Sequence, residues 1–479
     1  MKKQVFELGF GSTEDEIQVD RLPIQGKFPD WLNGSLIRNG PGTLQVGDET
    51  YRHWFDGHAM LHKFNFENGD IAYKNQFLET QSYRVAKAQE AIVYPEFATD
   101  PSWSFLDRVR NVFSPKPTDN AKVNVAKIGP HYMALAETPI QVIFDPRTLA
   151  TTGTFTFEDK LSGQMTTVHP HLDIKRNLAY NLVTRFHAAN HYRIYQLKNG
   201  QNQKLISSIP VRKPAYMHSF GMSENYFILT EFPLVVNSLS LLFWLKPYIE
   251  NYQWKPSNGT RFTVIDRHSG EIKARMKTDS FFAFHHINAF EKGNELICDI
   301  AAYNDARLIQ QFYLDQLASP QTELDFGKLR RYRIDMKSLK ISQETISDEC
   351  IELPNYDAAR YSTLENYRFV YAVSINENKR TGFYNQIVKV DIQGKANAHW
   401  YQPGCYPGEP VFVGRPGRQA EDDGVILSVV LDENTQTSFL LALDAGSFTE
   451  MGRAEVPHPI LFGYHGAFFN NEPSKTGAS

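Results

Sequence analysis

The sequence predicts an all-β protein, and two observations carry this prediction. Aromatic residues make up 13% of the 479 residues, with 33 Phe and 23 Tyr, and aromatic residues are enriched in strands. Turn residues also interrupt the apolar runs at short intervals. Residues 425–431, Val-Ile-Leu-Ser-Val-Val-Leu, are followed by Asp432-Glu433-Asn434 and then by a second apolar run over residues 438–443, which indicates a strand, a turn and a strand.

A loose motif recurs along the chain, in which an apolar strand ends in Asp and a polar turn follows. The spacing varies from roughly 50 to 120 residues, so any repeat is degenerate. Recurrent hairpin units of this kind are typical of propeller blades, but Asp also ends strands in other all-β proteins. The repeats alone leave both folds open. The five aspartates are Asp145, Asp266, Asp335, Asp391 and Asp444.

Two segments show the apolar spacing of a helix instead. Residues 102–113 place Trp103, Leu106 and Phe113 on one face. Residues 237–254 carry an apolar cluster that is too short to cross a bilayer but suits lying on one. Ordinary buried packing is the alternative for both segments. No stretch marks a linker, so residues 1–479 are predicted to form one domain. The apolar cluster consists of Leu241, Leu242, Phe243 and Trp244.

Composition excludes several classes of protein. The net charge is −4 and the isoelectric point is about 6.4, and no long basic run occurs, so nucleic acid is not an expected partner. Three cysteines, Cys298, Cys350 and Cys405, cannot form a disulfide framework. No apolar stretch is long enough for a leader or a membrane span. We therefore expect a cytoplasmic protein whose only membrane contact is peripheral.

Four of the 15 histidines lie in distinctive short neighbourhoods. Neutral imidazole is the commonest metal ligand, and four imidazoles without a cysteine suit iron, copper, nickel or zinc. They are separated by roughly 50, 70 and 180 residues, so only a closed fold would bring them to one point. A hydrogen-bonded core position is the alternative for each of them. They are His169 in Thr-Val-His-Pro-His, His218 in Met-His-Ser-Phe-Gly, His285 in Phe-His-His-Ile-Asn-Ala and His465 in Tyr-His-Gly-Ala-Phe.

Three glutamates occupy apolar or Pro/Gly-rich settings, namely Glu137 in Ala-Glu-Thr-Pro, Glu352 in Ile-Glu-Leu-Pro and Glu409 in Gly-Glu-Pro-Val. An unpaired carboxylate is costly in such a setting. A metal-bound imidazole needs an acceptor for its other ring N–H, and a carboxylate serves. The alternative is that these glutamates cap turns or lie half-exposed at strand ends.

These motifs occur in an order that resembles the carotenoid cleavage oxygenase family, which includes the retinal-pigment-epithelium isomerohydrolase. The likeness starts at residues 35–42, Ser-Leu-Ile-Arg-Asn-Gly-Pro-Gly, and continues through residues 53–57, His-Trp-Phe-Asp-Gly. It includes the four histidine neighbourhoods, Glu409 and residues 421–425, Glu-Asp-Asp-Gly-Val, and it ends at His465-Gly466. The resemblance therefore covers nearly the whole chain.

The resemblance implies a seven-bladed β-propeller with Fe(II) on its axis, under a dome of loops and short helices that encloses an apolar tunnel. By the same resemblance, each of the three glutamates accepts an N–H from one iron-binding imidazole, and one imidazole has no such partner. The implied iron ligands are His169, His218, His285 and His465, and the implied carboxylates are Glu137, Glu352 and Glu409, which leave His169 without a partner.

The activity implied by the resemblance is Fe(II)-dependent cleavage of a C=C bond of a carotenoid or apocarotenoid by O2, with aldehydes or ketones such as retinal-type apocarotenals as products. No side chain beyond the metal centre is expected to be catalytic. The protein is expected to place one double bond beside the metal and to exclude water. The depth of the tunnel would determine which double bond is cleaved. The candidate tunnel residues are Phe55, Ala136, Phe281 and Phe284, and core packing is the alternative for each Phe.

Three other functions compete with carotenoid cleavage. Stilbene-cleaving relatives commonly carry Lys just before the Glu137 position, whereas this chain has Ala136. The isomerohydrolase branch carries a Pro-Asp-Pro-Cys-Lys type of segment, whereas residues 99–103 read Thr-Asp-Pro-Ser-Trp. A non-catalytic propeller that binds an apolar ligand would have a broken ligand set, whereas all four histidines and three glutamates are present. We therefore favour the carotenoid dioxygenase.

Overall fold

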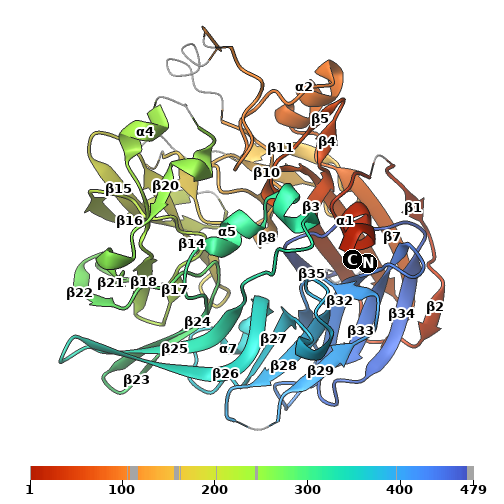
Figure 1. Cartoon of the computed structure of the whole chain (residues 1–479). Coiled ribbons are helices and arrows are strands. Elements are labelled where there is room, and N and C mark those ends of the chain that lie inside the picture. Colours follow the sequence, from red (N-terminus) through yellow and green to blue (C-terminus); the bar gives the residue numbers. More distant parts are fainter. Residues whose placement is uncertain are drawn as a thin grey trace, which may run out of the picture.

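The computed structural model describes residues 2–13, 15–104, 106–107, 117–155, 161, 163–200, 202–242, 246–394 and 396–471. The described chain is mostly β-strand, as the sequence predicts, and its strands form six larger sheets and two two-stranded ones. Figure 1 shows the larger sheets arranged in a ring around a common centre.

One sheet joins the two ends of the chain, because β35 pairs antiparallel with β3 from Arg38 opposite Gly466 to Gly34 opposite Asn470. A second sheet does the same through β2 and β34. These two pairings place strands from the start and from the end of the chain in the same sheets. The first sheet contains β1 (Gln18–Val19), β3 (Gly34–Thr43), β6 (His58–Glu67), β7 (Asp70–Phe77) and β35 (Gly466–Asn470); the second contains β2 (Ile24–Gly26), β30 (Cys405–Pro407), β31 (Val411–Gly414), β32 (Gly424–Asp432), β33 (Thr437–Asp444) and β34 (Glu450–Val456).

Three further antiparallel sheets pair mostly strands that are consecutive in the chain, so most of their pairings are local in sequence. Their strands are β8 (Asn124–Ile128), β9 (His131–Leu135), β10 (Gln141–Phe144) and β11 (Thr151–Phe155); β12 (Met165–Thr166), β13 (His171–Asp173), β14 (Leu178–Arg185), β15 (Asn190–Lys198) and β16 (Asn202–Val211); and β17 (Gly221–Met222), β18 (Tyr226–Glu231), β21 (Thr260–Asp266) and β22 (Ile272–Thr278). The small sheets pair β4 (Gln45–Val46) with β5 (Glu49–Thr50), and β19 (Leu234–Val236) with β20 (Tyr252–Trp254).

The largest sheet consists of two four-stranded units that share β26. The first part of β26 pairs with β25, up to Ile351 opposite Gly327. The pairing with β27 begins at Glu352, opposite Val373, and its register shifts before Asn355. Glu352 therefore lies where the strand passes from one unit to the next. The strands are β23 (His286–Lys292), β24 (Glu295–Ala302), β25 (Gly327–Asp335), β26 (Lys340–Asn355), β27 (Phe369–Ser374), β28 (Gln386–Asp391) and β29 (Ala398–Tyr401).

The five aspartates of the loose motif all end strands, and each begins the turn of a hairpin. Asp145 follows β10, and the other four are the last residues of β21, β25, β28 and β33. In every case Oδ1 accepts a backbone N–H two or three residues later, over 2.7–3.0 Å. Asp is favoured at such a position because its side chain accepts this backbone hydrogen bond and thereby closes the turn. The motif therefore marks one hairpin turn in each of five units.

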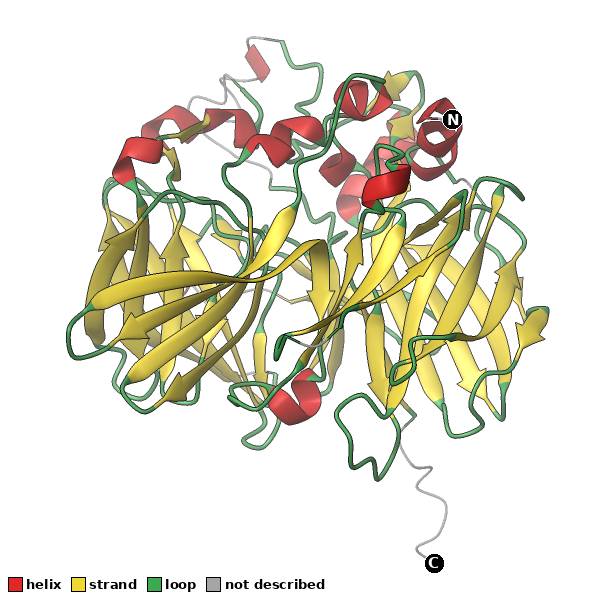
Figure 2. Cartoon of the chain, turned by 60° about the horizontal axis from the view of Figure 1, so that its bottom comes forward, coloured by secondary structure: helices red, strands yellow, loops and turns green. Residues whose placement is uncertain are grey.

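Short helices and loops gather over one face of the ring, as Figure 2 shows. Among the described residues, no helix is both long and apolar enough to span a membrane. The described residues of the segment 237–254 form a short helix, a 3-10 turn and strand β20. The helix expected over residues 102–113 is untested, because residues 105 and 108–113 lie outside the described residues. The helices are α1 (Lys2–Gly9), α2 (Gln81–Gln89), α4 (Ser238–Leu242), α5 (Arg307–Gln311), α6 (Leu314–Ala318) and α7 (Ala358–Tyr361), with 3-10 turns η1 (Trp54–Asp56), η3 (Tyr248–Asn251), η4 (Pro256–Asn258) and η5 (Glu377–Lys379).

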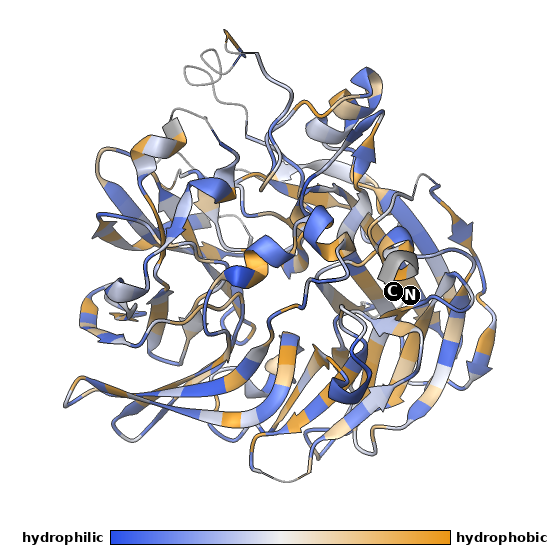
Figure 3. Cartoon of the chain, viewed as in Figure 1, coloured by the Kyte–Doolittle hydropathy of each residue, from blue (hydrophilic) through white to orange (hydrophobic). Residues whose placement is uncertain are grey.

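Apolar side chains pack between neighbouring sheets and under the helices. Along β7, burial alternates residue by residue, as expected for a strand with one face against the core. Figure 3 shows hydrophobic residues interspersed with hydrophilic ones along the strands of the ring. The largest core cluster is rich in aromatic residues and extends from α1 through Trp54, Phe284 and Phe312 to Tyr464. This packing holds the segments at the centre of the ring in place.

Candidate metal centre

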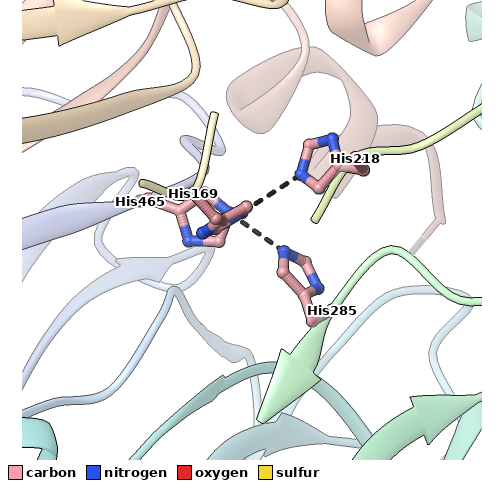
Figure 4. A group of neighbouring side chains, drawn as sticks. All are labelled: His169, His218, His285 and His465. Atoms are coloured by element: carbon pink, nitrogen blue, oxygen red, sulfur yellow. Dashed lines mark hydrogen bonds between the residues drawn. The ribbon is translucent and has the colours of Figure 1, made fainter. Parts of the chain in front are cut away.

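Four segments at the centre of the ring each bring one histidine to the same point. His218 and His169 precede strands β17 and β13, and His285 and His465 immediately precede β23 and β35. Their four ligand nitrogens all lie within 4.8 Å of one another, and Figure 4 shows the rings converging. The Nε2 atoms of His169 and His218 are 3.2 Å apart, and those of His285 and His465 are 3.1 Å apart. The structure thus brings together all four predicted ligands.

Three of these imidazoles contact a glutamate through the other ring nitrogen. Nδ1 of His218 lies 2.7 Å from Oε1 of Glu137, and Nδ1 of His465 lies 2.8 Å from Oε1 of Glu409. His285 makes the same contact with Glu352. Among the described residues, no carboxylate contacts the ring of His169. This is the arrangement that the family resemblance implied.

Further groups hold the glutamates, and the sequence analysis did not identify them. The hydroxyl of Tyr216 donates to Oε1 of Glu137 over 2.6 Å. The hydroxyl of Tyr303 donates to Oε2 of Glu352, and the backbone N–H of Gly466 donates to Oε2 of Glu409 over 2.8 Å. One signal was available, because Tyr216 lies two residues before His218 and alternate residues of an extended segment share a face.

Burial and neighbouring charges favour neutral imidazoles. Burial, followed by the other three imidazoles, lowers the pKa of His169 well below its usual value. Burial also lowers the pKa of His285 to about 4, although Glu352 opposes this shift. Burial alone would raise the pKa of Glu352, but His285 and the Tyr303 hydroxyl outweigh it, so that pKa is lowered. Neutral imidazole is the form that binds metal ions.

The hydrogen bonds to the glutamates show why this cluster fits a cation. A carboxylate at Nδ1 fixes the proton on that nitrogen, so Nε2 carries a lone pair. The Nε2 atoms of His285 and His465 therefore face each other as two acceptors at 3.1 Å. Two acceptors repel at this distance unless a cation lies beside both. The site can hold iron, copper, nickel or zinc on its donor atoms alone.

Two neighbouring histidines contact other groups. Nε2 of His171 lies 2.7 Å from the carbonyl oxygen of Phe220. The ring of His286 lies between the hydroxyls of Ser219 and Thr230, at 2.8 Å from each. His285 and His286 are adjacent, so strand alternation places their rings on opposite sides. These bonds satisfy both rings away from the cluster.

A cavity of about 800 Å³ adjoins the cluster on the side of His218, His285 and His465. Three of the four predicted tunnel residues line it, namely Phe55, Ala136 and Phe284. Aromatic side chains such as Trp54, Phe97 and Tyr464 form much of the remaining wall. A mostly apolar cavity of this size suits a long apolar ligand with few polar groups.

The fourth predicted tunnel residue, Phe281, does not line this cavity. This residue is buried but is not among the residues that line the cavity. Its ring stacks on Tyr332 at 4.6 Å between centroids and also contacts Phe232. Residues 281–284 alternate sides of an extended segment, so Phe284 reaches the cavity while Phe281 packs into the core.

The predicted membrane cluster can be placed only in part. Leu241 lies partly buried against the main core and lines the cavity, and membrane contact at this residue stays a prediction. The side chains of Leu242, Phe243 and Trp244 lie outside the described residues. On the same helix α4, Leu239 is 56% exposed and also lines the cavity, so this helix forms part of the cavity's outer wall.

Comparison with known proteins assigns the family. The sequence profile described as retinal pigment epithelial membrane protein matches residues 10–470. This chain belongs to the carotenoid cleavage oxygenase family. Its membership accounts for the order of the motifs along the whole chain, and the match ends at residue 470, the last residue of β35.

Relatives in the carotenoid cleavage oxygenase family share about a third of their residues with this chain. The mitochondrial carotenoid-cleaving dioxygenase of Macaca fascicularis is 33% identical, and the alignment covers 93% of this chain and 91% of the relative. The β,β-carotene 15,15′-dioxygenase of Gallus gallus is 32% identical, with 95% and 96% covered. The solved structure of cobalt-substituted Synechocystis apocarotenoid oxygenase superposes with a TM-score of 0.87 at 26% identity and covers 98% of this chain and 99% of the other.

Proposed function

We propose that this protein is an Fe(II)-dependent dioxygenase that cleaves a C=C bond of a carotenoid or apocarotenoid with O2 and yields aldehydes or ketones. The observation that carries the proposal is the four-histidine cluster beside a largely apolar cavity. Curated relatives of this family are named carotenoid dioxygenases. The ligands would be His169, His218, His285 and His465, and bound iron would supply the one-electron and O2 chemistry that side chains lack.

The protein's own residues orient the site and exclude water. Glu137, Glu352 and Glu409 hold the Nδ1 protons of three imidazoles, which leaves each Nε2 free to bind the metal. Their negative charges offset part of the cation's charge without occupying a coordination position. A conjugated alkene offers no group for acid–base catalysis, so the apolar wall has to bind the polyene by its shape. Ala136 is small and borders the cavity next to Glu137, so it leaves space for the polyene at that point.

We also propose that the chain is one seven-bladed β-propeller domain. Five of the larger sheets count as one blade each, and the largest sheet supplies two blades because its units share β26. The pairing of β35 with β3 supports closure of the ring. The likeness to apocarotenoid oxygenase over 98% of this chain supports the same architecture.

The experiment is anaerobic reconstitution with Fe(II), followed by incubation in air with a full-length carotenoid, a shorter apocarotenal or a hydroxylated stilbene. Aldehyde products that require both iron and O2, identified by mass, support the proposal. Cleavage of the stilbene alone would replace the proposed carotenoid cleavage with stilbene cleavage, the second activity known in the family. Ala136, where stilbene-cleaving relatives commonly carry Lys, favours the polyene. Tight binding of all three compounds without any product would indicate a binding protein.

A further inference from the structure

A lysine and a glutamate form a buried ion pair in the wall of the cavity, apart from the histidine cluster. Nζ of Lys122 contacts Oε2 of Glu96, and the two side chains are only 8% and 1% exposed. Both residues line the cavity. A buried ion pair is often no more stable than an apolar pair of similar volume, because both charges lose their hydration. Stability therefore does not explain why this pair lies in a largely apolar wall.

The surrounding polar groups fix the ammonium in one place. Oε1 of Glu96 accepts a hydrogen bond from the hydroxyl of Thr118 over 2.7 Å. Nζ of Lys122 also donates to the backbone carbonyl of Asp56 over 3.2 Å. The carboxylate of Asp56 is engaged elsewhere, by the N–H of Ala98 at 2.9 Å and the hydroxyl of Thr99 at 2.6 Å. Lys122 thus has two acceptors, and Asp56 offers it no carboxylate oxygen.

One donor of this ammonium has no acceptor among the described residues. An ammonium carries three N–H bonds, and Glu96 and the Asp56 carbonyl account for two of them. Lys122 lines the cavity, so a ligand in the cavity can provide the third acceptor. An N–H buried without an acceptor is costly, and a ligand oxygen removes that cost.

The backbone links this donor to the metal centre. Lys122 is followed by Val123, whose carbonyl accepts the backbone N–H of His465 over 3.2 Å. Val123 and His465 line the same cavity as Lys122. The side chain of Asn39 donates to the carbonyls of Ala121 and Asn124 on either side, at 2.7 and 3.0 Å. The segment that carries the ammonium is therefore held at a fixed place relative to the histidines.

We propose that Lys122 is a positioning residue that donates a hydrogen bond to an oxygen atom of the polyene, so that the preferred substrates are oxygenated polyenes rather than pure hydrocarbons. This inference rests on the proposed function. The group that Lys122 would recognise is an oxygen atom that accepts a hydrogen bond, in either a carbonyl or a hydroxyl group. A hydrocarbon of equal length leaves the buried N–H unpaired, and sites built around a buried polar group reject such analogues strongly. Anchoring the oxygen also fixes which double bond lies beside the histidines.

The test compares three polyenes of equal length that end in an aldehyde, an alcohol or a methyl group. The kcat/KM of the iron-loaded wild type for the better oxygenated compound should exceed that for the hydrocarbon by about 10- to 100-fold, as for a hydrogen bond to a charged group. In the double variant K122M/E96Q, which removes both charges together, this ratio should fall toward one. Dissociation constants measured with metal-free protein should show the same change.

A surface pair provides the matched control. Lys273 and Glu271 form an ion pair at 2.7 Å, with side chains 39% and 69% exposed, and K273M/E271Q should keep the wild-type ratio. An unchanged preference in K122M/E96Q, or no preference in the wild type, would overturn the assignment of Lys122. Equal loss of affinity for all three compounds would show a purely structural role and would also overturn it. If no compound is cleaved, the dioxygenase proposal fails, and the binding ratios still decide the role of Lys122.

Discussion

The carboxylate of Glu409 contacts both the ring of His465 and the next residue's backbone. Its Oε1 lies 2.8 Å from Nδ1 of His465, and its Oε2 accepts the N–H of Gly466 over 2.8 Å. Both residues are buried, and 56 positions of sequence separate them. Because both oxygens accept from donors on neighbouring residues, the carboxylate fixes the ring's orientation and its protonated nitrogen together.

Glu409→Gln should therefore weaken metal binding. An amide offers one oxygen and one NH2 group, so it cannot accept from both the His465 ring and the Gly466 N–H. Loss of such a partner typically costs about 10- to 100-fold in metal affinity. Anaerobic competition against a chromogenic chelator measures the affinity. Glu455→Gln is the control, because that carboxylate is exposed and bonds only Gln25 among its described contacts. Equal affinity of wild type and Glu409→Gln would contradict the role given to Glu409.

Metal should stabilise the wild type but not His465→Ala. The Nε2 atoms of His285 and His465 lie 3.1 Å apart, and a cation beside both would remove the repulsion between their lone pairs. A ligand that binds only the folded state raises its stability, by about 2.7 kcal/mol at a hundredfold excess over Kd. Thermal unfolding with and without anaerobic Fe(II) measures the shift. His171→Ala should keep the shift, because His171 bonds the Phe220 carbonyl. A full shift in His465→Ala would remove His465 from the ligand set.

Local chemistry made parts of the fold predictable from sequence. The hairpin predicted around Asp432-Glu433-Asn434 forms as β32 and β33, paired from Val425 opposite Asp444 to Asp432 opposite Thr437. The strand-ending aspartates were also predictable, because each closes its own turn with its side chain. Other features depend on distant segments. No local signal shows that β26 serves two units or that β35 pairs with β3.

The residues of the candidate site likewise fall into those that the sequence indicated and those that it did not. The four histidines and three glutamates were found through the order of their motifs, which the family likeness supplied. Phe281 packs on Tyr332 and not along the cavity, because composition does not tell which of several neighbouring aromatic residues faces a cavity. Lys122 and Glu96 were missed because they are 26 residues apart and neither has a distinctive neighbourhood. Their pairing depends on how the loop carrying Glu96 packs against the segment before β8.

Phe281 and Phe55 should respond differently to truncation. Phe281→Ala removes a core ring that stacks on Tyr332, so the free energy of unfolding should fall by about 3–5 kcal/mol while the cleaved bond stays the same. Phe55→Ala enlarges the cavity beside Phe284, 5.8 Å away between ring centroids, so the range of accepted chain lengths or the cleaved bond should change. Denaturant unfolding and product masses measure the two effects. A changed product pattern in Phe281→Ala would return that residue to the tunnel wall.

Glu96 should make stability depend on pH. Burial raises the pKa of this carboxyl to about 7, although Lys122 and the Thr118 hydroxyl oppose the shift. A carboxyl whose pKa is raised on folding stabilises the protein while it is protonated, and this contribution is lost as pH rises from about 4.5 to about 7. Relative to Glu96→Gln, the wild type should therefore lose stability over this range, by no more than about 3 kcal/mol.

The measurement is denaturant unfolding of metal-free wild type and Glu96→Gln at several pH values between about 5 and 8. The two proteins differ only at residue 96, so contributions that both share cancel in the difference. The difference should level off only well above pH 7, where Glu96 is ionised in both the folded and unfolded states. A difference that stays constant across the range would mean that Glu96 is already ionised at pH 5, held so by Lys122. The cavity would then carry a full ion pair at every pH where the enzyme is assayed.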